Sequence, residues 1–173
     1  MFVSLRTIFD RTLSAFVILL LASLTVIIVM GVVYRKMGWS LVWYDEVASI
    51  MLAWLTYYGA ALAALKRAHI GFPGMVNAMR PQFRVPAVLF GEACVILFFA
   101  LMAWFGYQVL VILEGDTLVT LPGITTALAQ SVIPVGAVLF IIAQLLSLPE
   151  ILEQARGQGV IDAEQKALQE ILK

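Results

Sequence analysis

Glu92 is the charged residue that the sequence places deepest inside an apolar segment. It lies about two turns into the stretch from residue 85 to residue 113, and a carboxylate in lipid is costly unless it is functional or paired. One interpretation is a proton or ion site. The other is a structural ion pair with Arg84, which precedes the same stretch, or with a cation of another subunit. We favour the ion pair, because Glu92 lies near the end of the stretch where such cations are found.

Asp45 and Glu46 are a second acidic feature, and a pair of carboxylates can act as general acid and base. Adjacent residues of a helix point about 100° apart, however, and no histidine or nucleophile is near these two in the sequence. Carboxylates at the start of a helix complement its positive end. Capping and anchoring are therefore the favoured roles.

His69 and Cys94 are the only histidine and the only cysteine of the chain. One cysteine excludes an intrachain disulfide and a cysteine zinc cluster, and one histidine excludes bis-histidine haem ligation and a multi-histidine metal site. His69 follows the basic pair Lys66 and Arg67 and has no visible orienting partner for base catalysis. We expect it to contact phosphate headgroups or another subunit. The uncharged Gln144 is expected to join helices by hydrogen bonds.

The composition indicates that lipid is the main solvent of the chain. Of its 173 residues 62% are hydrophobic and only 13% are charged, whereas about a quarter of the residues of a soluble domain are charged. Four segments have the roughly 20 apolar residues that a helix needs to cross a bilayer. They are residues 13–33, 44–65, 85–113 and 130–148. The sequence therefore predicts an all-α integral membrane protein with four helices, and its net charge of zero indicates no affinity for nucleic acid.

The distribution of lysine and arginine predicts the orientation of these helices. Nine of the eleven lie before the first segment, between the second and third, or after the fourth, and only Arg35 and Lys36 lie on the opposite side. Because basic residues resist translocation, both termini are predicted to be cytoplasmic. The first segment is longer than the apolar core of a secretory signal, so we interpret it as an uncleaved helix. Residues 2–10 fit either a short interfacial helix or a frayed terminus.

The domain organisation follows from the same pattern. Residues 1–149 are predicted to form one transmembrane domain, and residues 150–173 a cytoplasmic tail that begins after Pro149. Within the domain, the segment 44–65 has a face of small and weakly polar side chains. This face includes Ser49, Thr56, Gly59 and Ala63 at helical spacing. Small residues let another helix approach closely in a membrane, so we expect a docking surface for protein.

The same segment and its flanks contain a set of residues that is recognisable as a whole: Trp43, Asp45, Glu46, Trp54, Gly59, Ala60, Ala63, Lys66, Arg67, His69 and Ile70. In this set the chain resembles the small membrane subunit, of DctQ type, of tripartite ATP-independent periplasmic (TRAP) transporters. The resemblance extends over about residues 5–150 and includes the size, the four-helix layout and a proline near the start of the last helix. The family often has two glutamates at the acidic pair and an arginine at the position of Ser49.

The resemblance implies a function that the residues alone do not. In such systems a periplasmic solute-binding protein delivers an organic acid, such as sialic acid or a dicarboxylate, and a large membrane subunit moves it with sodium ions. The small subunit supports the large one, and its outer loops are candidates for transient contact with the binding protein. The implied place is the bacterial inner membrane, among lipids. The chain itself is implied to be non-catalytic and to need no cofactor, since sodium binds the large subunit.

The resemblance and the small-residue face together predict a subunit interface. We expect it to include Trp43, Asp45, Glu46, Ser49, Trp54, Thr56, Gly59, Ala60, Ala63, Lys66, Arg67 and His69. Two other classes of function are open at this point. A self-sufficient small transporter would use Glu92 as its coupling carboxylate. A membrane redox or quinone enzyme is disfavoured, because one histidine and one cysteine supply too few ligands.

Overall fold

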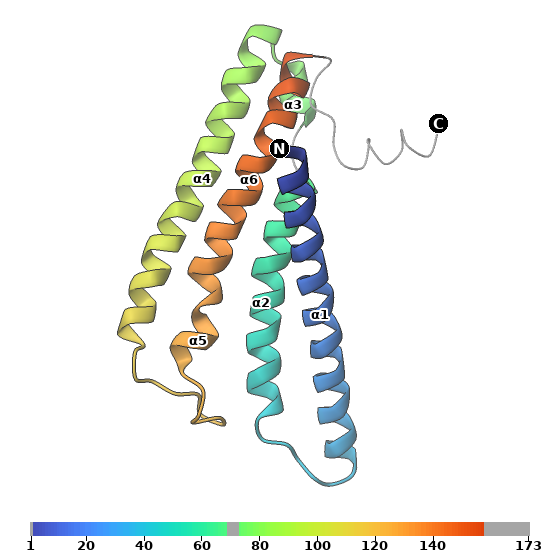
Figure 1. The fold of residues 1–173 in the computed structure, drawn as a ribbon, viewed down its shortest axis with the longest axis vertical. Coiled ribbons are helices and arrows are strands. Elements are labelled where there is room, and N and C mark those ends of the chain that lie inside the picture. The colour runs from blue at the N-terminus through green and yellow to red at the C-terminus, as the bar shows by residue number, and fades with distance from the viewer. Residues whose placement is uncertain (1, 69–72, 158–173) are drawn as a thin grey trace, which may run out of the picture.

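The fold is a set of long helices joined by short connections (Figure 1). The computed structural model describes residues 2–68 and 73–157. The helices in it are α1 (Phe2–Lys36), α2 (Tyr44–Leu65), α3 (Pro73–Ala78), α4 (Pro81–Ile112), α5 (Thr126–Gln130) and α6 (Val132–Arg156). Four of them, with α5 running on into α6, are long and apolar enough to cross a bilayer. The prediction of an all-α protein with four membrane-spanning helices is therefore confirmed.

The long helices lie in a row whose order differs from their order in the chain. Figure 1 shows α4 and α1 at the two edges, with α6 and α2 between them. The main contacts follow this order, since α1 packs on α2, α2 on α6, and α6 on α4. Along their axes the helices have two ends. We call the end at which α1 starts and α6 stops the terminal end, and the opposite end the loop end. Which end faces the cytoplasm stays a prediction.

The core of the row is built from small side chains that let the central helices approach closely. Ala61 and Ala64 of α2 and Ala143 of α6 are almost fully buried, and Phe140 fills the space between them. The ring of Phe140 stacks on that of Phe99 of α4, with 3.7 Å between centroids. The hydrophobic effect does not drive helices together in lipid. Helices associate there through dense van der Waals packing, which small residues at the crossing allow. The central helices α2 and α6 are therefore tightly joined.

One glycine shows how close this approach is. A Cβ added at Gly136 of α6 would lie 2.8 Å from the Cβ of Tyr57 on α2. Real side chains do not tolerate that separation, so the backbones of α2 and α6 can pass at this point only because position 136 has no side chain. On the two outer helices, α1 and α4, many apolar side chains lie on the surface of the protein and are exposed. An exposed apolar surface of this extent suits lipid rather than water.

The observed helix bounds differ from the predicted ones mainly at the terminal end. The prediction for 44–65 agrees with α2 at both ends. The helix predicted from residue 13 already begins at Phe2, so residues 2–10 continue α1 and are neither a separate interfacial helix nor frayed. The helix predicted to end at residue 148 instead continues through Pro149 to Arg156. Its last turns stay helical because they are held by neighbours, Ala155 being almost fully buried.

Candidate functional site

A buried polar cluster joins three helices at the terminal end. Arg67, just after α2, donates from Nη1 to Oε1 of Glu92 on α4 across 2.5 Å. Gln144 of α6 donates from Nε2 to the other carboxylate oxygen, Oε2. Glu92 and Gln144 are buried, at 8% and 7% exposure, and Ser147 beneath them is fully buried and donates to the carbonyl of Gln144. Both oxygens of the carboxylate are thus engaged inside the chain. Gln144 joins helices as expected.

The predicted partner of Glu92 was wrong. Arg84 does not pair with Glu92, because it lies eight residues earlier on the same helix, a rise of about 12 Å. Its guanidinium instead donates to the carbonyls of Met79 and Asn77 at the end of α3, at 3.2 and 2.9 Å. Basic side chains commonly satisfy such free carbonyls at helix ends. Arg84 therefore fixes α3 to α4, and the structural ion pair favoured for Glu92 is made by Arg67.

Arg67 reaches Glu92 from an unusual backbone position. The amide of Ala68 bonds the carbonyl of Ala63, and that of Arg67 bonds the carbonyl of Ala64. This double pattern is a Schellman motif, whose left-handed position is usually glycine. Arg67 occupies it with φ of 53°. A side chain in this left-handed conformation costs about 1 kcal/mol or more. From this position the guanidinium of Arg67 reaches the buried carboxylate of Glu92.

Two partly exposed ion pairs lie at the same end of the helices as this cluster. Arg6 of α1 lies 2.9 Å from Glu150 of α6 and also donates to the carbonyl of Leu65 at 3.2 Å. Lys66 pairs with Asp10 of α1 at 3.4 Å. Charged side chains at this level are consistent with the place where the helices leave the hydrocarbon. Together with the buried cluster, these pairs connect all four long helices at the terminal end.

The predicted docking face of α2 lies on the outside of the row. Asp45, Ser49 and Thr56 are exposed, and a Cβ added at Gly59 would meet nothing within 4 Å. The hydroxyls of Ser49 and Thr56 each donate to the carbonyl one turn earlier, at 2.8 Å. Ala60 and Ala63 are half-buried beside them. Within the described part of the chain, the outward face of α2 is therefore left open, with the hydroxyls of Ser49 and Thr56 already hydrogen-bonded.

Other residues of the predicted interface are used inside the chain instead. Trp54 donates from Nε1 to the carbonyl of Ala129 at the end of α5, at 2.9 Å, and so fixes α5 against α2. Trp43 is half-buried at the residue before α2. Lys66 and Arg67 make the ion pairs described above. His69 lies outside the described residues. The predicted interface set thus divides into a group of internal contacts and an open stripe on α2, which consists of Asp45, Ser49, Thr56, Gly59 and Ala63.

Asp45 and Glu46 also have different roles. Glu46 accepts hydrogen bonds from the amides of Val119 and Thr120, at 3.1 and 2.8 Å, and from the hydroxyl of Thr120. These bonds hold the loop between α4 and α5, in which Thr117 and Thr125 form a β-bridge. Asp45 is exposed and has no ion-pair partner in the described ranges. The acidic pair therefore consists of one residue that orders the loop and one that faces outward.

We expect Glu46→Gln to accelerate amide hydrogen exchange at Val119 and Thr120. A neutral amide offers one acceptor oxygen in place of two charged ones, so the three bonds cannot all be kept. Exchange mass spectrometry on the full chain in detergent would measure the effect. Asp45→Asn is the matched control, since it removes the neighbouring charge without touching the loop. Equal exchange in the two variants would contradict the role of Glu46.

The comparison with known proteins agrees with this architecture. A family model described as "Tripartite ATP-independent periplasmic transporters, DctQ component" matches residues 24–154. The chain belongs to the DctQ family. It is therefore a component of a tripartite transporter and not an enzyme. The matched region begins within α1 and includes α2, α4 and most of α6, and with them Glu92, Gln144 and the open stripe. No curated protein matches the sequence.

Membership of the DctQ family gives the cluster and the stripe their setting. The family is part of a system with a large membrane subunit and a binding protein, and the chain is a multi-pass membrane protein. The cluster of Arg67, Glu92 and Gln144 bonds both oxygens of its carboxylate within the chain, whereas Nε and Nη2 of Arg67 are buried and have no hydrogen-bond partner among the described residues. Its carboxylate has no free oxygen for a transported ion. Among the residues that the structure describes, no other helix covers the stripe on α2.

Proposed function

We propose that the chain is the non-catalytic small subunit of a sodium-coupled transporter for an organic acid, and that it acts as a scaffold for the large membrane subunit. The observation that carries this proposal is the open stripe of α2. In this proposal substrate and sodium bind the large subunit, in the inner membrane. The small subunit contributes a rigid, lipid-anchored wall.

The chemistry of the open stripe supports close contact with another helix. Burying a hydroxyl is costly only when it loses a hydrogen bond, and the hydroxyls of Ser49 and Thr56 keep theirs within α2. Gly59 leaves room for a partner backbone. Asp45, at the loop end of the stripe, offers an unpaired carboxylate to a cation of the partner. The stripe can therefore be covered without breaking any contact inside the chain.

We expect Gly59→Leu to weaken recovery of the large subunit on the order of tenfold, since overpacking a tight contact costs about 1–3 kcal/mol. Copurification of both subunits with a tagged small subunit measures this. The chain alone should unfold as before, because the added side chain enters open space. Gly91→Leu on α4 is the matched control, as position 91 is equally open but lies on another helix. Loss of assembly by both variants, or by neither, would sink the proposal.

A second part of the proposal concerns the loop end. Glu46 holds the loop of residues 113–125, and the side chain of Val119 in it is 91% exposed. If both termini are cytoplasmic, as the lysine and arginine distribution predicts, this loop faces the periplasm. We infer that the loop contributes to docking of the solute-binding protein. Val119→Asp should then weaken binding of that protein while leaving recovery of the large subunit unchanged.

The alternative of a self-sufficient transporter requires a carboxylate that can take up and release an ion. Glu92 instead has both oxygens bonded, one to Arg67 and one to Gln144. Reconstitution of the chain alone into vesicles tests this alternative. We expect no uptake of any organic acid; uptake that stops with Glu92→Gln would favour it.

A further inference from the structure

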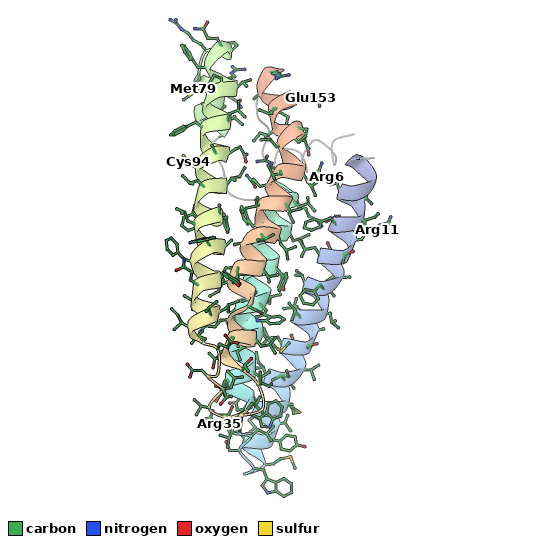
Figure 2. The ribbon with its side chains drawn as sticks, turned by 60° about the vertical axis from the view of Figure 1, so that its left-hand side comes forward. Arg6, Arg11, Arg35, Met79, Cys94 and Glu153 are labelled. Carbon is green, nitrogen blue, oxygen red and sulfur yellow. The ribbon has the colours of Figure 1, made fainter. Side chains whose placement is uncertain are left out.

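A groove runs along the last turns of α6 at the terminal end, and nothing described so far uses it. It has a volume of about 540 Å³. Its lining on α6 consists of Leu145, Leu148, Pro149, Leu152, Glu153 and Arg156. These residues recur at intervals of one to four positions and therefore share one side of the helix. Figure 2 shows the labelled Glu153 near the terminal end of α6.

We infer that the groove lies at the level where α6 leaves the hydrocarbon. Glu150, in the middle of this stretch, pairs with Arg6 of α1, and ion pairs of this kind belong at the membrane boundary. Leu145 lies about 7.5 Å to the apolar side of Glu150, and Arg156 about 9 Å to the polar side, at a rise of about 1.5 Å per residue. The polar headgroup region adds roughly 5–7 Å to each side of a bilayer. The groove therefore extends from the hydrocarbon into the headgroup region.

The two ends of the groove differ in chemistry in the way a phospholipid does. Leucines line the end toward the hydrocarbon, and Glu153 and Arg156 line the other end. Both charged side chains are exposed, and neither forms an ion pair within residues 2–68 and 73–157. The guanidinium of arginine suits the oxygens of a phosphate, and a carboxylate suits an ammonium group that can donate hydrogen bonds. A ligand with both groups would satisfy both residues.

We propose that this groove binds a zwitterionic phospholipid with a primary ammonium headgroup. Its phosphate contacts Arg156, its ammonium contacts Glu153, and an acyl chain lies along Leu145, Leu148 and Leu152. A glycerol headgroup, which has a net negative charge and no ammonium, would leave the carboxylate of Glu153 without a positive group to neutralise it. A choline headgroup has no N–H to donate to that carboxylate. The site is thus predicted to prefer ethanolamine over both glycerol and choline headgroups, and it does not depend on the proposed partner.

The preference can be measured on the full chain in nanodiscs of phosphatidylcholine that contain equal minor amounts of phosphatidylethanolamine and phosphatidylglycerol. Native mass spectrometry after release counts the lipids that stay bound. We expect phosphatidylethanolamine to be retained, and Arg156→Gln to lower its retention roughly fivefold, as one cation near a membrane surface contributes about 1 kcal/mol. Glu153→Gln should shift retention toward phosphatidylglycerol. Arg11→Gln, which removes an exposed cation of α1 outside the groove, should change neither.

Several results would overturn the proposal. An equal loss with Arg11→Gln and Arg156→Gln would mean that general charge attraction holds the lipid. Retention that is unaffected by either variant at positions 153 and 156 would place the lipid elsewhere. Leu148→Trp, which fills the apolar part of the groove, should also reduce retention if the acyl chain lies there. Low retention of every lipid together with a dimeric mass would assign the groove to a second copy of the chain instead.

Discussion

Arg67→Ala is expected to destabilise the isolated chain by about 3–5 kcal/mol, the usual cost of removing one partner of a buried ion pair. The loss leaves the carboxylate of Glu92 buried at 8% exposure with only Gln144 to bond it. Most of the effect is thus the cost of an uncompensated charge rather than of a missing contact. Reversible unfolding of the full chain in mixed detergent micelles, followed by tryptophan fluorescence, measures the change.

Two further variants separate charge from backbone strain. Arg67→Met combined with Glu92→Gln removes both charges, keeps an amide beside Gln144, and should recover most of the stability. Arg67→Gly also loses the ion pair but relieves the left-handed backbone. It should therefore be more stable than Arg67→Ala by roughly 1 kcal/mol. If the double variant were no more stable than Arg67→Ala, the buried charge would not be the cause.

The second large effect is expected from Gly136→Leu, which should separate α2 from α6. The new Cβ would lie 2.8 Å from the Cβ of Tyr57, an atom fixed to the backbone, so the helices themselves must move apart. Overpacking typically costs about 1–3 kcal/mol. We expect the upper part of that range or more, because the buried Ala61, Ala64 and Ala143 of the same core cluster would lose their packing together.

Gly59→Leu is the matched comparison for this effect. It makes the same substitution on α2, on the open face that does not contact α6. Unfolding of the isolated chain should be unchanged for Gly59→Leu and clearly easier for Gly136→Leu. Recovery of the large subunit should fall for both, through its interface in the first case and through the fold in the second. Unchanged stability of Gly136→Leu would contradict the close approach of α2 and α6 at this position.

The sequence predicts α2 well and the ends of its neighbours less well, for identifiable reasons. Acidic residues lie in the first turn of α2 and basic residues directly follow its last residue, so charge marks both of its limits. The end of α6 has no such charge signal, and Pro149 predicts that the helix ends there. The helix nevertheless continues, because a proline removes only one backbone bond and the ion pair of Glu150 with Arg6 holds the turn that follows. That pair depends on tertiary structure and has no local signal.

The site shows the same limit. The sequence identifies Glu92 as a paired carboxylate and Gln144 as a joining residue, since both are polar in apolar segments. It does not identify Arg67 as the partner, because nearness in the chain favours Arg84. Choosing between the two requires the positions of α2, α4 and α6 relative to one another. The divided roles of Asp45 and Glu46 likewise depend on where the loop of residues 113–125 lies.

The order of helices in the row has a consequence for the way the chain is built into the membrane. α6 is synthesised after α2 and α4, yet it lies between them, and α4 makes its main helix contact with α6. During synthesis α1 and α2 can pair at once, whereas α4 must wait in the lipid without its neighbour. The last helix to emerge then has to insert into the middle of the row. Assembly of this subunit is therefore completed from the inside, and a chain interrupted before α6 would leave α4 without its main helix neighbour, joined to α2 mainly through α3 and the Arg67–Glu92 ion pair.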